Sequence, residues 1–317
     1  MTLSRPLPLA LLGAALLGAL WALPTQAAAN DQPATGGQAP GIYGMQALVK
    51  SFEAIAGDMK AGCGFRPGEV AFGALFLNVG GSHLRTVELT AGERYAFSAG
   101  GDEDVVDVEL SLFDWAGNVV ATETERAPQA RLSITPEVTG TYSLQVTLTE
   151  SAAQSFCGFV IAGTDGQPTS GSSVQSTVAT AAVFIDGMVE EMDGEGMKCG
   201  LMTAEQTLSM WGGIVGGESA IAVPSYQPGL GLLAVAGLCG DEEGNIDIRT
   251  IDRFGKTLGE DESPESLGSV VYESDNTETW TYLINRSGDG QPRVGMTVGL
   301  RIQKPETLEA SRRQMMR

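Results

Sequence analysis

The sequence predicts a mainly β protein built from two tandem antiparallel β-sandwich domains, jelly-roll-like in character, each preceded by an amphipathic α-helix. Three observations carry this prediction. Short alternating segments lie between Gly, Pro and Asp turns, two stripes of apolar residues have helical spacing, and the second half of the chain follows the first at a fixed offset. Glycine makes up 42 of the 317 residues, which suits a chain with many tight turns.

The first 29 residues have the pattern of a cleavable secretory signal. Arg5 is followed by an apolar run, and the segment closes with Ala27, Ala28 and Ala29, the small residues typical of a cleavage point. Prolines interrupt the run, and it is shorter than the roughly 20 residues that a bilayer requires. We therefore expect an exported protein, periplasmic or extracellular, that is not inserted in a membrane after signal cleavage.

Two segments rich in Gly, Ser, Thr, Gln and Pro divide the rest of the chain and read as flexible. After each of them, apolar residues recur at helical spacing, first from Met45 to Met59 and then from Val178 to Met192. The expected organisation is a flexible N-terminal segment at 30–41, a first helix-plus-sandwich domain at 42–162, a linker at 163–177, a second such domain at 178–304 and a C-terminal tail at 305–317.

Each half is rich in predicted strands after its helix. The first half contains LRTVELTAG, ERYAFSAG, VDVELSLFD, GNVVATE, ARLSITP, GTYSLQVTLTE and FCGFVIAG. The second contains SAIAVPSY, GLLAVAGL, NIDIRTID, GSVVYES, ETWTYLINRS and RVGMTVGLRIQ in the same order. Residues 109–146 correspond to residues 247–284 without a gap, which indicates a diverged tandem duplication.

The segment ERYAFSAGGDEDVVDVELSLFDWAGNVVATE, followed by ITPEVTGTYSLQV, resembles the bacterial pre-peptidase C-terminal domain. The matching features are an acidic strand that enters a D-x-x-G turn at Asp114–Gly117 and a T-G-T-Y strand at Thr139–Tyr142. The second half departs from the pattern, with Glu278 and Trp280 at the positions of Gly140 and Tyr142. The resemblance implies a non-catalytic sandwich of an exported protein.

The chain is strongly acidic, with a formal net charge of -20 at pH 7. A surface of this sign repels phosphate backbones and anionic lipid headgroups, which disfavours nucleic acid as a partner. The expected partner is an unknown protein or polysaccharide.

The stretch GDEDVVDVEL contains the strongest candidate for a metal site. Calcium prefers six to eight oxygen ligands, and the acidic loops of both halves offer such oxygens at Asp102, Asp104, Asp107, Asp241, Glu243 and Asp247. Neither loop has the spacing of an EF-hand. The alternative, which we prefer, is a solvated turn that keeps a sheet edge charged.

No catalytic signature stands out, and we expect no catalytic residue and no cofactor apart from calcium in the alternative above. His83 is the only histidine, so a Ser-His-Asp hydrolase would have to use it, yet it follows a glycine turn at the start of a predicted strand.

The four cysteines of an exported chain favour two disulfides. Pairing within each half predicts Cys63–Cys157 and Cys199–Cys239, although four cysteines allow three connectivities.

These observations favour an exported, non-enzymatic β-sandwich protein that acts as a binding or structural module of the cell envelope or the extracellular space. Two alternatives stay open. One is a calcium-stabilised adhesion or matrix component, and the other is a carboxylate-dependent hydrolase.

Overall fold

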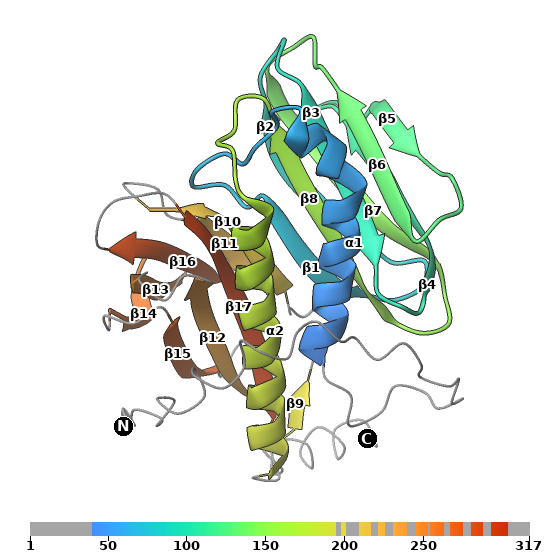
Figure 1. Cartoon of the computed structure of the whole chain (residues 1–317). Coiled ribbons are helices and arrows are strands. Elements are labelled where there is room, and N and C mark those ends of the chain that lie inside the picture. Colours follow the sequence, from blue (N-terminus) through green and yellow to red (C-terminus); the bar gives the residue numbers. More distant parts are fainter. Residues whose placement is uncertain are drawn as a thin grey trace. The chain divides into compact units, whose positions relative to one another are not determined.

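The computed structural model describes residues 40–194, 198–200, 209–216, 221–225, 231–239, 245–252, 254–262, 267–274, 280–287 and 293–303. Within these residues the protein is mainly β, with antiparallel sheets and two helices, which confirms the predicted fold class (Figure 1). Neither of these two helices is long and apolar enough to cross a membrane.

Nine of the described strands form one main sheet, in the order β15-β12-β17-β10-β1-β8-β3-β6, with β9 paired to β17. The bounds of these strands are Phe72–Leu77 for β1, Tyr95–Gly101 for β3, Gln129–Ile134 for β6, Ser155–Gly163 for β8, Lys198–Gly200 for β9, Ser209–Val215 for β10, Gly231–Cys239 for β12, Leu267–Ser274 for β15 and Arg293–Gln303 for β17.

Two four-stranded sheets accompany the main sheet, and we call them the outer sheets. The first has the order β2-β7-β4-β5 and the second has the order β11-β16-β13-β14. Their bounds are Ser82–Leu89 for β2, Val105–Phe113 for β4, Val119–Glu123 for β5, Gly140–Ser151 for β7, Ile221–Ser225 for β11, Asn245–Asp252 for β13, Thr257–Asp261 for β14 and Trp280–Ser287 for β16.

The main sheet runs without a break from the first half of the chain into the second, because β1 pairs with β10 in antiparallel register from Phe72↔Gly212 to Leu75↔Ser209. Outward from this pair the order is β1-β8-β3-β6 on one side and β10-β17-β12-β15 on the other. The two halves of the chain are therefore joined inside one sheet. Neither joining strand was predicted from the sequence, since a strand buried on both faces lacks polar alternation.

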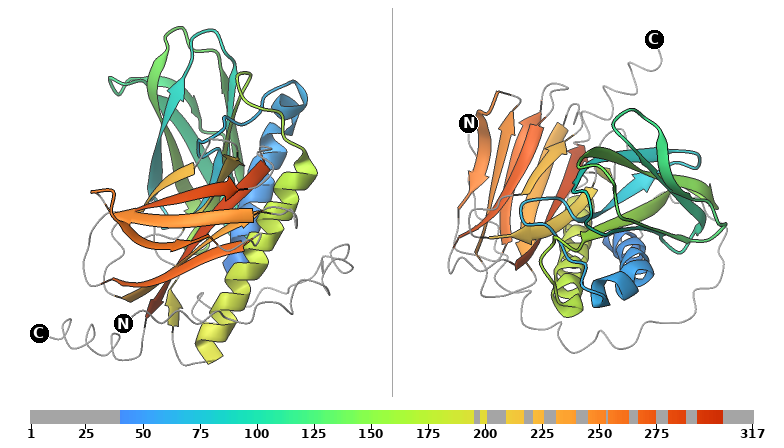
Figure 2. Two further views of the ribbon diagram at one scale, coloured as in Figure 1. Left: turned by 90° about the vertical axis from the view of Figure 1, so that its left-hand side faces the viewer. Right: turned by 90° about the horizontal axis from the view of Figure 1, so that it is seen from above.

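Helices α1 (Pro40–Lys60) and α2 (Gly171–Gly194) pack against each other and against one face of the main sheet (Figures 1 and 2). Helix α2 begins earlier than predicted, because residues 171–177, which we expected in the linker, form its first two turns. The reason is an N-cap: the Ser170 hydroxyl accepts a hydrogen bond from the Ser173 N–H at 3.1 Å. The polar residues that indicated a linker lie in this capped first part of the helix.

The main sheet separates two hydrophobic cores. One core lies against the outer sheets and contains Phe97, Leu110 and Trp211, and the other lies against the helices and contains Leu48 and Phe72 among others. Strand β8 shows the division clearly, because Cys157 and Phe159 belong to the first core whereas Phe156 and Val160 belong to the second. The alternation of side chains along β8 thus places neighbouring residues in different cores.

Candidate functional site

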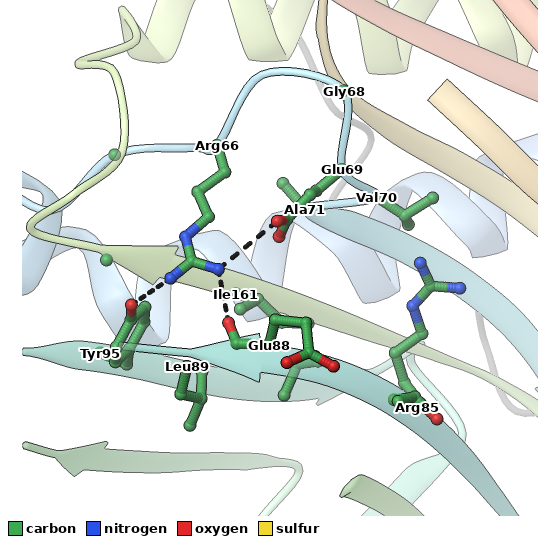
Figure 3. A pocket seen from close by; sticks show the side chains of 14 residues that line it. Arg66, Gly68, Glu69, Val70, Ala71, Arg85, Glu88, Leu89, Tyr95 and Ile161 are labelled. Atoms are coloured by element: carbon green, nitrogen blue, oxygen red, sulfur yellow. Dashed lines mark hydrogen bonds and ion pairs between the residues drawn. The ribbon is translucent and has the colours of Figure 1, made fainter. Parts of the chain in front are cut away.

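A pocket of about 240 Å³ lies beside strand β2, next to the loop at 64–71 that leads into β1 (Figure 3). Strand β2 contributes Arg85, Val87 and Leu89 to the lining. The main sheet contributes Tyr95 from β3 and Ile161 from β8. The pocket therefore opens between the main sheet and the first outer sheet.

Arg66, on the loop, is held in place by a network of hydrogen bonds (Figure 3). Its Nε donates to Asp165 Oδ2 at 2.9 Å, its Nη1 donates to the Glu88 carbonyl, and its Nη2 donates to the Tyr95 hydroxyl. The guanidinium carbon also lies 5.2 Å from the centre of the Tyr95 ring. Arg66 thus ties the loop to β2, to β3 and to the connection before α2.

The ionisation of Asp165 follows from these contacts. Burial opposes the charged form, but hydrogen bonds from Arg66 and from the Tyr95 hydroxyl outweigh it and lower the pKa of Asp165. Burial together with the bond to Asp165 raises the pKa of Tyr95. At neutral pH the network is therefore a carboxylate, a neutral phenol and a guanidinium.

At the other end of the pocket, the Arg85 guanidinium lies over the ring of Trp211, at 5.7 Å from its centre. Trp211 is on β10, so the second half of the chain supports a side chain that lines a pocket in the first half. Gly73 leaves room for this ring, because a Cβ at Gly73 would lie 2.9 Å from Trp211 Cε3. The arginine is positioned by a cation–π contact with a buried aromatic residue.

His83 is buried next to the contact between Arg85 and Trp211. Its ring lies 5.4 Å from the centre of Trp211 and 6.2 Å from that of Phe159, and it is only 9% exposed. Burial, reinforced by Arg85, lowers the pKa of His83 to about 4. The ring is therefore neutral at neutral pH and closed to substrate, which is a poor arrangement for a general base.

Asp102, at the head of the acidic stretch of the first half, is turned into the protein. Asp102 is 3% exposed, and its carboxylate accepts the Phe156 N–H at 2.7 Å and the Asp104 N–H at 3.2 Å. Burial raises the pKa of Asp102 to about 6. The prediction of a solvated turn is wrong for Asp102, because this side chain is buried. Its hydrogen bond to Phe156 connects the turn between β3 and β4 to strand β8.

The other calcium candidates lie partly inside and partly outside the described residues. Asp104 is exposed, whereas Asp107 is buried and accepts the Ala127 N–H at 3.2 Å. Asp247 lies on β13, while Asp241 and Glu243 fall outside the described residues. Among the residues that are described, no group of three or more His, Cys, Asp or Glu side chains could hold a metal ion.

The structure does not contain the predicted Cys63–Cys157 disulfide. Both cysteines are free thiols, and both are buried. Cys63 lies in the core beside the helices and Cys157 lies in the core beside the outer sheets, so the main sheet stands between them. Cys63 instead accepts a hydrogen bond from Arg94 Nη2 at 3.6 Å. The side chains of Cys199 and Cys239 are outside the described set.

The residues of the pocket were not predicted from the sequence, although strand β2 carries one signal of them. Alternation along Ser82–Leu89 places His83, Arg85, Val87 and Leu89 on one face, and that face is the buried one. A charged residue on the apolar face of a strand is uncommon. Arg85 was therefore the one position of this strand that the pattern could have marked as unusual.

Comparisons with known proteins give no family. No protein-family model matches the chain, and no curated protein matches it either. A solved structure of the M60 catalytic domain with CBM51 domains of Clostridium perfringens ZmpB is 7% identical with a TM-score of 0.22, over 72% of this chain and 34% of that one.

Two further structures are similar at the same level. The conserved protein PA5104 of Pseudomonas aeruginosa is 11% identical over 72% of this chain and 77% of its own, with a TM-score of 0.20. The CUB1-EGF-CUB2 region of human MASP-1/3 is 12% identical over 73% of this chain and 99% of its own, with a TM-score of 0.19. TM-scores this low establish no relationship, so the site has to be interpreted from its own geometry.

Proposed function

We propose that this chain is an exported, non-enzymatic binding module whose ligand occupies the pocket beside β2. The pocket supports this proposal because it combines apolar side chains, Val87 and Leu89, with the fixed guanidinium of Arg66. A site built on side chains that are already held in place loses little entropy when a ligand binds. This preorganised rim, in which Arg66 is paired with Asp165 and Glu69, is the observation that carries the proposal.

The charged groups around the pocket favour binding over catalysis. Arg66, Asp165 and Tyr95 are engaged with one another, and His83 is buried and neutral. A hydrolase needs a nucleophile and a base within reach of a substrate, or two facing carboxylates. Two carboxylates do line the pocket, but Glu69 pairs with Arg66 at 3.4 Å and Glu88 accepts the Thr141 hydroxyl at 2.6 Å.

Export rests on the signal-like residues 1–29, and the resemblance to the pre-peptidase C-terminal domain supports a non-catalytic role outside the cytoplasm. The partner is a protein or a polysaccharide. The high negative charge of the chain favours partners that are neutral or basic over anionic ones.

The test uses residues 30–317, immobilised and offered to arrays of peptides and glycans. Ile161→Trp fills the pocket from its main-sheet side, and Val79→Trp places the same ring at an exposed position (50% exposed) outside the pocket lining. We expect binding to the wild type and to Val79→Trp, with a loss of at least tenfold in Ile161→Trp. Equal binding by all three proteins, or hydrolytic turnover that a pocket variant abolishes, would overturn the proposal.

A further inference from the structure

The open edge of β2 carries the inference. Strand β2 is the first strand of its sheet and pairs with β7, and among the described strands it has no partner on the other side. In an antiparallel pair, the backbone groups of alternate residues point toward the partner strand and those of the residues between point away. Hydrogen bonds at both ends of β2 show which of its residues point their backbone groups toward β7 and which point them toward the open edge.

Three hydrogen bonds fix these directions. Leu148, next to the end of the β2–β7 ladder, donates to Gly81 O in the turn before β2, so the odd-numbered side faces β7. From the other side, Arg66 donates to Glu88 O, and Thr90 N donates to the Tyr95 hydroxyl at 3.0 Å. The even-numbered residues of β2 therefore direct their backbone groups to the open edge.

Part of this edge is closed and part is open. Two edge-facing backbone groups already have partners: Glu88 O accepts a hydrogen bond from Arg66, and Thr90 N donates one to the Tyr95 hydroxyl. Within the described residues, no hydrogen bond engages the edge-facing backbone groups of Leu84 and Thr86. An exposed row of unpaired N–H and C=O groups is a template for another strand.

The pocket lies where such a strand would place a side chain. Thr86 and Glu88 line the pocket together with Arg85 and Val87, and Ile161 of the main sheet also lines it. Figure 3 shows Ile161 between Arg66 and strand β2. Side chains of a strand added beside β2 would alternate, so that every second one points toward the main sheet. The edge and the pocket thus form one site for an extended chain.

We propose that the ligand is an extended peptide that adds to β2 as a further strand, hydrogen-bonded to Leu84 and Thr86, with one apolar side chain in the pocket. This proposal deepens the proposed function and rests on it. Main-chain bonds supply affinity in this mode of recognition, and the pocket supplies selectivity. The apolar contacts at Val87, Leu89 and Ile161 favour an aliphatic or aromatic side chain, and the net charge of -20 favours a peptide without net negative charge.

The experiment selects a phage-displayed library of random 12-residue peptides on residues 30–317 and then measures the enriched peptides on three proteins. Thr86→Pro removes the edge N–H and leaves the bonds to β7 in place, because Thr86 faces away from β7. Proline is tolerated at such edge positions. Thr86→Val changes the side chain and keeps the N–H. We expect binding to Thr86→Pro to be at least tenfold weaker than binding to Thr86→Val.

Hydrogen–deuterium exchange on the wild type gives a second readout that does not depend on the folding of a variant. The enriched peptide should slow exchange at the Leu84 and Thr86 amides at least tenfold. Peptides that bind Thr86→Pro as well as wild type and leave these amides unprotected overturn strand addition. If such binding is still lost in Ile161→Trp, the pocket function stands without the added strand, whereas a library and a glycan array that give no pocket-dependent ligand overturn both proposals.

Discussion

Asp114 and Asp252, 138 residues apart, accept equivalent pairs of backbone hydrogen bonds. Asp114 Oδ1 accepts the N–H groups of Ala116 and Asn118 at 2.9 and 2.8 Å. Asp252 Oδ1 accepts those of Phe254 and Lys256 at 2.8 and 2.9 Å. A glycine with positive φ follows in each turn, at 83° for Gly117 and 81° for Gly255. The repeat in the sequence thus corresponds to a repeated hydrogen-bonded turn.

These turns predict a matched set of glycine substitutions. A Cβ at Gly117 or Gly255 would meet no atom within 4 Å, so the cost of Gly→Ala comes from the positive φ alone. We expect Gly117→Ala and Gly255→Ala each to lower the free energy of unfolding by about 1 kcal/mol. Gly140→Ala is the control, because it also has open space but lacks a positive φ. Urea unfolding that shows all three variants equal to wild type would contradict this explanation.

The fold was predictable where the pattern of residues is local. Alternation identified most strands, and the D-x-x-G turns identified the repeat, because both signals depend on neighbouring residues. The β1–β10 pair was not predictable, since the apolar segments FGALFL and SMWGGIV carry no alternation. The pocket depends on that pair, because Trp211 reaches Arg85 only after the two halves join.

The β1–β10 junction can be tested at Gly73. A Cβ there would lie 2.7 Å from the Met210 carbonyl oxygen and 2.9 Å from Trp211 Cε3. We expect Gly73→Ala to lower the free energy of unfolding by roughly 1 to 3 kcal/mol, with a change in the near-ultraviolet circular dichroism of Trp211. Gly57→Ala, in the open interior of α1, should stabilise by up to about 1 kcal/mol. A Gly73→Ala protein with wild-type stability would be incompatible with the described junction.

Asp102 predicts a pH dependence with a definite sign. Burial raises its folded pKa to about 6, above the 3.8 of an aspartate in water, so the folded state holds the proton more tightly than the unfolded state. Its contribution to stability is therefore largest below about pH 4 and is lost as the pH rises to about 6. Asn at this position cannot ionise, and its side-chain carbonyl can still accept the Phe156 N–H.

We expect Asp102→Asn to gain stability relative to wild type between pH 4 and pH 7, by on the order of 3 kcal/mol at 1.36 kcal/mol per pKa unit. Chemical unfolding at several pH values measures the difference between the two proteins. A difference that stays constant across this range would show that Asp102 is not buried as described.

His83 predicts a dependence of opposite sign. Burial, then Arg85, lowers its folded pKa to about 4, so the unfolded state takes up a proton first as the pH falls below 6.5. Wild type should therefore lose stability between about pH 6.5 and pH 4, and His83→Phe should not, because phenylalanine fits between Phe159 and Trp211 without a charge. We expect the variant to gain on the order of 3 kcal/mol relative to wild type across this range. If the unfolding free energies of wild type and His83→Phe change in parallel with pH, the His83 ring is exposed to water and the account is wrong.

The most direct measurement is a crystal structure of residues 30–317 bound to a peptide enriched on the wild-type protein. We predict an extended chain hydrogen-bonded to Leu84 and Thr86, with one apolar side chain beside Val87 and Ile161. A peptide bound elsewhere, for example at Trp115, which is 82% exposed at the tip of the β4–β5 hairpin, would contradict the assignment of the pocket.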